Sequence, residues 1–281
     1  MIKLNKYILL PLLVILTWSF CQGQGHSITA ISFNIRYDNP NDGPDNWNMR
    51  KADLVSTMLE LTPWVLGIQE GLHHQVQYLN QGLKAYKYVG VGRDDGKTNG
   101  EYCAIFYDTG QLTPLRSGTF WLSDTPDTIS VGWDASMERI CSYALFQITG
   151  GSRFWVFNTH FDHKGPEARE NSARLILAQI EKMNIDFLPV ILMGDFNATP
   201  EEPPIRLISQ QLTDAGNSLQ IVQGRPTGTF NGFRGNAEQR RIDFIFVSGM
   251  QVESYLHLDA RTESNRNLSD HLPVVGTFSI P

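Results

Sequence analysis

The stretch VILMGDFN at residues Val190–Asn197 has the composition of a strand that ends in polar residues. Val190–Met193 is a short apolar run of the kind that forms β-strands. Asp195 and Asn197 follow it and are two residues apart, so in an extended segment their side chains point the same way. A carboxylate at a strand end often serves only in a turn. This stretch alone is therefore compatible with a structural or a catalytic role.

The same pattern recurs in three other places along the chain. Asn34 closes the run ITAISF, Glu70 closes WVLGIQ, and His160 and Asp162 follow FWVFNT. Four apolar strands therefore deliver carboxylates, amides or an imidazole at their C-terminal ends. Strand ends that meet at one edge of a sheet are a common place for a functional site.

Two further polar groups stand at the starts of strands. Asp243 lies within RIDFIF, and Asp270 and His271 precede LPVV. The start of a strand lies beside the end of its antiparallel neighbour, so all six groups can share one edge. A single histidine or aspartate of this kind is more often structural. Six such groups together are difficult to explain by packing.

Strands outnumber helices in the pattern of apolar residues. Helical periodicity is clear only over Met49–Leu61 and Pro166–Met183. The predicted strands are Ile28–Ile35, Trp64–Gln69, Cys103–Tyr107, Ile140–Ile148, Phe154–Thr159, Val190–Met193, Ile242–Val247 and Leu272–Phe278. Several connections are too short for a crossover helix, which favours an antiparallel or mixed arrangement over a doubly wound parallel sheet. No repeat or long linker appears, so the sequence predicts one domain.

The first 25 residues have the features of an export signal. Lys3 and Lys6 precede the apolar run Tyr7–Phe20, and small residues follow. This run is shorter than the roughly 20 apolar residues that a membrane span needs. We therefore expect residues 1–25 to be a signal peptide, residues 26–281 to be the single catalytic domain, and the protein to be periplasmic or extracellular. Lipid anchoring at Cys21 is the alternative, although Phe20 suits such a site poorly.

The polar motifs, taken in order, resemble those of a known family. FNIR at Phe33–Arg36, QE at Gln69–Glu70, NTHFD at Asn158–Asp162, GDFN at Gly194–Asn197, RIDF at Arg241–Phe244 and SDH at Ser269–His271 are similar to the six motifs of the endonuclease/exonuclease/phosphatase superfamily. The Tyr37–Trp47 insert resembles a group of secreted bacterial members. This resemblance implies a deoxyribonuclease-I-like, α+β fold: a four-layer α/β/β/α sandwich of two mixed, mainly antiparallel sheets flanked by helices.

The resemblance also implies a metal site. Hydrolysis of a phosphoester requires a hard cation to neutralise developing charge, and hard cations prefer oxygen ligands. By similarity Glu70 is the principal ligand, Asp270 contributes, and Asn34 orients metal-bound oxygens or phosphate. Mg²⁺ is the expected ion, and Mn²⁺ fits the same oxygens.

The remaining motif residues are assigned roles by the same resemblance. His271 is expected to contact the phosphoryl group, with Asp243 as its carboxylate partner. His160 is the second family histidine, and Glu101 lies where its partner occurs in related nucleases. Asp195 and Asn197 are expected to hold the attacking water, and the general base is either Asp195 or a histidine. Arg139 and Asp162 are expected at the periphery of the site. Arg139 would either contact the phosphate or form a surface salt bridge.

The charge of the chain favours a small substrate. The net charge is −6 and becomes −8 when Lys3 and Lys6 are removed. Proteins that bind long nucleic acids usually carry a basic patch, whereas the densest basic spot here is Arg240–Arg241. The sequence therefore predicts an exported, Mg²⁺-dependent phosphodiesterase or phosphatase acting on a small or exposed phosphoester. The alternatives are an extracellular nuclease, a sphingomyelinase-like enzyme, which would need an apolar docking hairpin, and a catalytically silent protein that binds phosphoesters.

Several properties are not encoded in these patterns. The sequence does not distinguish a monoester from a diester substrate, one metal ion from two, or a monomer from an oligomer. No stable membrane insertion is expected after processing. Cys103 and Cys141 can form a disulfide or remain as two buried thiols.

Overall fold

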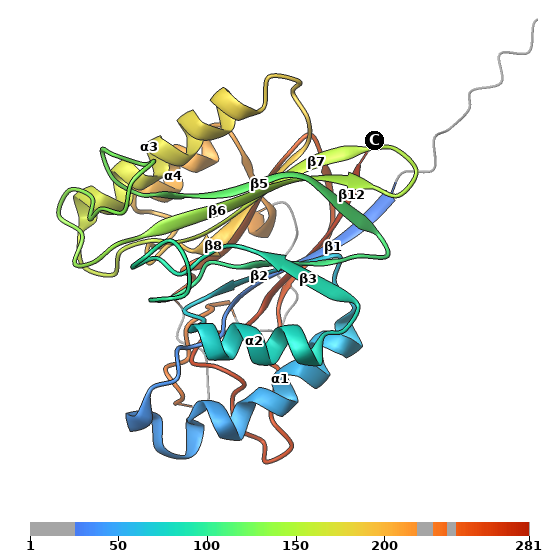
Figure 1. Ribbon diagram of the computed structural model, residues 1–281, viewed down its shortest axis with the longest axis vertical. Coiled ribbons are helices and arrows are strands. Elements are labelled where there is room, and N and C mark those ends of the chain that lie inside the picture. Colours follow the sequence, from blue (N-terminus) through green and yellow to red (C-terminus); the bar gives the residue numbers. More distant parts are fainter. Residues whose placement is uncertain (1–25, 218–226, 235–239, 281) are drawn as a thin grey trace, which may run out of the picture.

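The computed structural model describes residues 26–217, 227–234 and 240–280. They form two six-stranded sheets stacked face to face, with helices on both outer faces (Figure 1). The predicted four-layer α/β/β/α sandwich is therefore confirmed. The predicted signal peptide at residues 1–25 lies outside the described residues.

The first sheet has the strand order β11-β12-β1-β2-β4-β3. Its strands are β1 (His26–Asn34), β2 (Val65–Gln69), β3 (Tyr86–Val89), β4 (Ile105–Asp108), β11 (Gln251–His257) and β12 (Val274–Ile280). The second sheet has the order β5-β6-β7-β8-β10-β9. Its strands are β5 (Leu112–Trp121), β6 (Ile140–Ile148), β7 (Arg153–His160), β8 (Val190–Asp195), β9 (Thr213–Asp214) and β10 (Asp243–Ser248).

Each sheet has one parallel pair among antiparallel ones. In the first sheet β1 runs parallel to β2, and in the second β7 runs parallel to β8. Strand β10 runs antiparallel to β8, with Asp243 opposite Asp195. The start of β10 therefore lies beside the end of β8, which is the arrangement that the sequence predicts for this edge.

The helices form the two outer layers. They are α1 (Trp47–Leu61), α2 (His73–Gly82), α3 (Pro166–Met183) and α4 (Pro203–Ser209), with short 3₁₀ turns η1 (Pro40–Asp45) and η2 (Ala215–Asn217). Helices α1 and α2 pack on the first sheet, where Leu54 and Leu79 join one apolar cluster. Helices α3 and α4 pack on the second sheet, where Ile176 and Ile205 join another. A third cluster fills the space between the sheets. No helix of the described residues is long and apolar enough to cross a membrane.

Local sequence explains where the two long helices begin. The Asn46 side chain accepts a hydrogen bond from the main-chain nitrogen of Asn48 and caps α1. Helix α3 begins at Pro166, a residue suited to a first helical position because it has no N–H to leave unsatisfied. The Asp134 carboxylate accepts from the nitrogen of Ala168 in that first turn. The acidic group near this helix start is also favoured by the helix dipole.

A buried asparagine joins the two sheets next to their functional edge. The Asn158 Nδ2 group in β7 donates to the carbonyl oxygens of Ile68 and Ala104, at 2.9 Å each. Its Oδ1 atom accepts from Gln69 Nε2 at 2.7 Å. Gly67 in β2 explains how the sheets come so close, because a Cβ atom there would lie 2.9 Å from the Asn158 side chain. These hydrogen bonds fix the spacing of strands from different sheets.

We predict that Asn158→Ala lowers the free energy of unfolding by roughly 2–4 kcal/mol, because it leaves buried hydrogen-bonding groups without partners. Urea denaturation followed by circular dichroism measures this change. Asn48→Ala, at an exposed position of α1, is the control and should change stability by less than about 0.5 kcal/mol. Equal stability of the two variants would contradict the proposed role of the inter-sheet contact.

Candidate active site

One amide connects the two sheets at their functional edge. The Asn34 Nδ2 group, at the end of β1, donates to Glu70 Oε1 at 2.9 Å and to Asp195 Oδ2 at 3.0 Å. Its Oδ1 atom accepts from the main-chain nitrogen of Arg36 at 3.0 Å, which fixes the orientation of the amide. Glu70 Oε2 also accepts from the nitrogen of Tyr37 at 3.1 Å. In this arrangement the Asn34 nitrogen, and not its oxygen, faces the carboxylates.

Three residues of this edge have left-handed backbone conformations. The φ angles are 59° at Arg36, 62° at Glu70 and 46° at Asn197. Such angles are uncommon for residues other than glycine, and they concentrate at functional sites, where the surrounding structure holds them. Each of these residues directly follows or closes the end of a strand. The turns therefore direct polar side chains to the space between the sheets.

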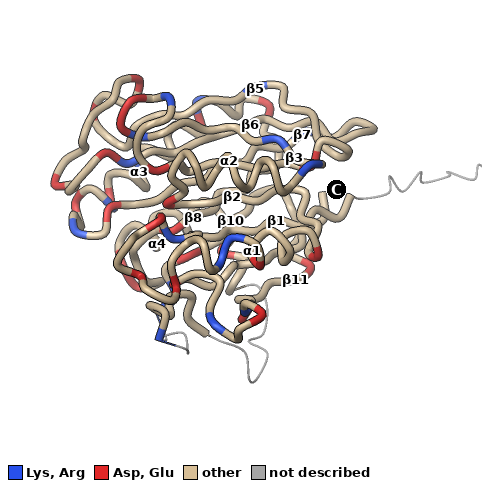
Figure 2. Tube along the Cα trace, turned by 60° about the horizontal axis from the view of Figure 1, so that its bottom comes forward, with Lys and Arg blue, Asp and Glu red and all other residues tan. Residues whose placement is uncertain are grey.

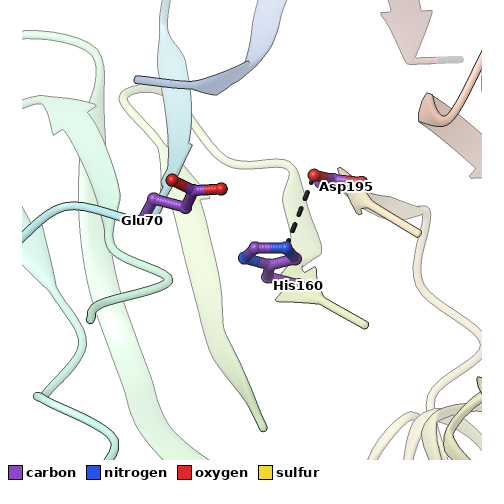
Figure 3. Close-up of side chains that lie close together, drawn as sticks. All are labelled: Glu70, His160 and Asp195. Carbon is purple, nitrogen blue, oxygen red and sulfur yellow. Dashed lines mark ion pairs between the residues drawn. The ribbon is translucent and has the colours of Figure 1, made fainter. Parts of the chain in front are cut away.

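His160, Asn197 and Asp195 form a connected group on the second sheet. Asn197 Nδ2 lies 3.0 Å from His160 Nε2, and because an amide nitrogen only donates, Nε2 is the acceptor. The same imidazole nitrogen lies 3.4 Å from Asp195 Oδ2. Figure 3 shows the side chains of Glu70, His160 and Asp195 converging from three different strands. One ligand atom from each lies within 4.8 Å of the others.

His271 lies between two carboxylates. Its Nδ1 atom is 2.8 Å from Asp243 Oδ2, and its Nε2 atom is 3.7 Å from Asp195 Oδ2. Burial opposes a charge on this imidazole, but the two carboxylates outweigh burial and raise the pKa of His271 well above its ordinary value. The two carboxylates therefore favour the protonated, cationic form of His271.

The pKa values of Asp195 and His160 are shifted in opposite directions, and both shifts favour the neutral form of the side chain. Burial and the neighbouring charge of Asp243 raise the pKa of Asp195 to about 7. Burial and the nearby guanidinium groups of Arg139 and Arg93 hold the pKa of His160 well below its usual range. His160 is thus neutral while Asp195 exchanges a proton near neutral pH. Groups with such shifts are typical of sites that transfer protons.

Glu70 and Asp270 provide oxygen atoms suited to a hard cation. Burial and the negative charge of Glu70 raise the pKa of Asp270, while His271 and Arg36 oppose this shift. The Arg36 Nη1 atom lies 3.9 Å from Glu70 Oε2 and 3.7 Å from Asp270 Oδ2, so a cationic group already occupies the space beside both carboxylates. Buried carboxylates that repel one another and attract a cation fit a divalent metal ion.

Glu101 lies near His160 but is hydrogen-bonded elsewhere. Its carboxylate accepts two hydrogen bonds from Arg93, at 2.7 and 3.1 Å. Glu101 Oε2 is 4.0 Å from His160 Nδ1, and this buried nitrogen has no hydrogen-bond partner among the described residues. The structure therefore places the predicted carboxylate beside its histidine, with Arg93 holding it back from direct contact.

Arg139 and Asp162 form a buried pair behind His160. Arg139 Nε lies 3.3 Å from Asp162 Oδ2, and both side chains are almost completely buried, so Arg139 does not form a surface salt bridge. Asp162 also accepts from the main-chain nitrogens of Lys164 and Gly165. Asp162 thus stabilises the turn before α3. Arg139 remains next to the site, with its buried Nη1 atom lacking a partner among the described residues.

The structure brings most of the predicted residues to one place and adds others. The eight predicted catalytic and metal residues meet where the ends of β1, β2, β7 and β8 and the start of β10 come together, as the preceding distances show. Arg36 and Arg93 were not assigned roles from the sequence. Arg36 stands inside the FNIR motif, which was a signal for its position. Arg93 lies in a turn-rich stretch with no such signal. Cys103 and Cys141 are buried free thiols.

We predict that the titration of Asp195 destabilises the chelator-treated protein as the pH rises from about 4 through about 7. A carboxyl group with a raised pKa binds its proton more tightly in the folded chain, so the stabilisation from Asp195 fades as pH rises from about 4 through about 7. His271, whose folded-state pKa is also raised, changes stability in the same direction, whereas His160, whose folded-state pKa is lowered, changes it in the opposite direction. Asp195→Asn should flatten the dependence by roughly 1–3 kcal/mol, since one unit of pKa corresponds to about 1.4 kcal/mol.

Urea unfolding of the chelator-treated protein at several pH values measures this slope. Asp186→Asn is the matched control, because Asp186 is exposed and pairs with Arg153, at the opposite end of β7 from His160. Identical slopes for the wild type and Asp195→Asn would show that Asp195 does not titrate as described.

Comparison with known proteins finds relatives that match most of this chain. An endonuclease/exonuclease/phosphatase family protein of Bacteroides thetaiotaomicron superimposes with a TM-score of 0.86 and 36% identity, covering 92% of this chain and 100% of its own. A mannosyl-6-phosphatase of the same species has a TM-score of 0.84 and 36% identity, with 89% and 99% covered. An uncharacterized protein of Acanthamoeba polyphaga mimivirus is 30% identical, with 83% and 92% covered.

The profile of the Endonuclease/Exonuclease/phosphatase family matches residues 31–271, which is most of the chain and includes all of the convergent polar residues. The match agrees with the two-sheet fold and with two clusters of side chains that could hold a metal ion, Glu70 with His160 and Asp195, and Asp195 with Asp243 and His271. This chain therefore belongs to the endonuclease/exonuclease/phosphatase family and is a metal-dependent phosphoester hydrolase.

Proposed function

We propose that the chain is an exported, Mg²⁺- or Mn²⁺-dependent phosphatase that hydrolyses a small phosphoester, in particular a sugar phosphate monoester. The observation that carries this proposal is the site itself. A carboxylate with a pKa near 7, a cationic histidine and a pair of oxygen-ligand carboxylates lie at one sheet edge. These are the groups that metal-assisted attack of water on phosphorus requires.

Glu70 and Asp270 are proposed to hold the metal ion, with Asn34 fixing the orientation of Glu70. The ion, when bound, neutralises charge that develops on the phosphoryl oxygens. Asn34 suits an orienting role because its nitrogen donates to both Glu70 and Asp195. Mg²⁺ is proposed because Glu70 and Asp270 both offer oxygen atoms, and Mn²⁺ fits the same ligands.

Asp195 is proposed as the general base and His271 as the phosphoryl contact. With its pKa near 7, Asp195 can accept a proton from a water molecule held by Asn197. The cationic His271, held by Asp243, can donate a hydrogen bond from Nε2 to a phosphoryl oxygen. Neutral His160 positions Asn197, whose amide contacts its Nε2 atom.

The distribution of charge supports a small substrate. Lys and Arg residues are scattered along the trace and alternate with Asp and Glu, without a continuous basic strip among the described residues (Figure 2). Arg241, half of the densest basic spot in the sequence, is neutralised by Asp214 at 2.6 Å. Long nucleic acids are bound mainly through many phosphate contacts. The likeness to a mannosyl-6-phosphatase over nearly the full length supports a sugar phosphate in particular.

Export is proposed on the sequence of residues 1–25 alone. Removal of this segment leaves the described domain from His26 onward. The protein would then act in the periplasm or outside the cell. Mass spectrometry of the protein from cell fractions tests this proposal, since an intact N-terminus in the cytoplasmic fraction would contradict it.

We predict that His271→Ala and Asp195→Ala each lower kcat by at least about 10²-fold, because each removes a group that acts on the transition state. His74→Ala is the matched control, since this histidine is exposed and pairs with Asp38 outside the site. It should retain activity within about twofold, as surface substitutions usually do. Full activity in either site variant would remove that residue from the proposed mechanism.

A substrate panel tests the proposed specificity. The chelator-treated protein is assayed with mannose 6-phosphate, p-nitrophenyl phosphate, bis-p-nitrophenyl phosphate and DNA, with and without Mg²⁺ or Mn²⁺. Metal-dependent release of phosphate from the monoesters but not the other substrates is the expected result. Metal-dependent cleavage of DNA would favour the nuclease alternative. Inactivity on every substrate, with retained phosphate binding, would favour the silent binding protein.

A further inference from the structure

A buried arginine lies beneath the metal-ligand side of the site. Arg50, in α1, is almost completely buried, and its hydrogen bonds among the described residues all go to main-chain carbonyl oxygens. Its Nη1 atom donates to Ile35 at 3.0 Å and to Leu268 at 2.6 Å. No carboxylate of the described residues lies within ion-pair distance of it. A buried guanidinium without a paired carboxylate is unusual, because burial of a charge is unfavourable.

The two carbonyl groups belong to segments that are far apart in sequence. Arg50 lies 15 residues from Ile35 and 218 residues from Leu268. Ile35 stands between Asn34 and Arg36, and Leu268 stands two residues before Asp270. One guanidinium nitrogen therefore joins the loop that carries the orienting amide to the loop that carries a proposed metal ligand.

The loop that carries Asp270 is held along its whole main chain. Its successive carbonyl groups each accept a hydrogen bond: Leu268 from Arg50, Ser269 from Asn231 Nδ2, and Asp270 from the nitrogens of Asn231 and Gly232. The Ser269 hydroxyl donates to the Asn34 carbonyl oxygen at 2.7 Å. Asn231 and Ser269 each fix one part of this loop. Arg50 connects it to both the Ile35 main chain and the η1 turn, through Asp45 at 2.6 Å.

Packing keeps the guanidinium of Arg50 in one place. It lies over the Trp47 ring, 5.7 Å from the centroid, and over the Phe233 ring at 5.4 Å. Flanking rings stabilise a cation that has no paired carboxylate. The planar group can then act as a rigid link with a fixed direction for each hydrogen bond.

We propose that Arg50 is a positioning residue that sets the distance between Asp270 and the Asn34–Glu70 pair, and so determines how well the site binds a divalent cation. The proposal rests on the proposed metal role of Glu70 and Asp270, and it is independent of which phosphoester is hydrolysed. Residues that orient metal ligands without touching the ion commonly change metal affinity by about 10- to 100-fold when they are substituted.

The test measures the affinity of the chelator-treated full chain for Mn²⁺, by electron paramagnetic resonance of the free ion. Arg50→Met should weaken Mn²⁺ binding by at least about tenfold. Arg50→Lys, which keeps the charge but lacks the fork, should lie between Arg50→Met and the wild type. Arg266→Met is the matched control, because Arg266 pairs with the same η1 turn through Asp45 but does not contact Ile35 or Leu268. It should bind Mn²⁺ within about twofold of the wild type.

A merely structural role would lower the melting temperature of Arg50→Met without changing the affinity of the folded protein for Mn²⁺, and that result would overturn the proposal. If Arg50→Met does not fold, Arg50→Lys decides the question, and wild-type affinity in that variant would count against the proposal. Mn²⁺ binding to the wild type without hydrolysis of any ester would contradict the proposed function and leave the role of Arg50 testable. Absence of Mn²⁺ binding to the wild type would contradict both the proposed function and the proposed role of Arg50.

Discussion

The hydrogen bonds from Asn34 to Glu70 and Asp195 join carboxylates that are carried by different sheets. In a sandwich fold the space between two sheets is filled mainly by interdigitating apolar side chains, whose contacts have no fixed direction. At the functional edge Asn34 and Asn158 replace that apolar contact with hydrogen bonds of fixed direction. The position of the metal-binding carboxylates relative to Asp195 depends on these amides.

The chemistry follows from the charges that this constraint brings together. Several acidic groups are buried within a few ångströms of one another, and burial raises the pKa of Asp195 and of Asp270. Cations within the chain relieve this repulsion: His271 stands between Asp195 and Asp243, and Arg36 stands beside Glu70 and Asp270. Glu70 and Asp270 would hold a divalent ion, which would supply further positive charge at this edge. The charged groups that would stabilise the transition state are thus held in place before the substrate binds.

The sequence was sufficient to predict the fold class, the strands with continuous apolar runs and the residues that meet at the edge. It did not predict β3, β5, β9 or β11. The outward side chains of β5, for example, are exposed, so this strand lacks a continuous apolar run. The roles of Arg50 and Arg93 were also missed. Arg50 acts through main-chain carbonyl groups as far as 218 residues away, and such contacts leave no local pattern. Glu101 was placed near His160, but its preference for Arg93 arises from three-dimensional competition between partners.

The most direct measurement is a crystal structure of the full chain soaked with Mn²⁺, with the ion located by anomalous scattering. The account predicts one strong peak bonded to oxygen atoms of Glu70 and Asp270, with Asn34 still donating to Glu70 and Asp195. A peak confined to Asp195, Asp243 and His271, or the absence of any peak at Glu70, would contradict the proposed division of this edge into a metal side and a proton-transfer side.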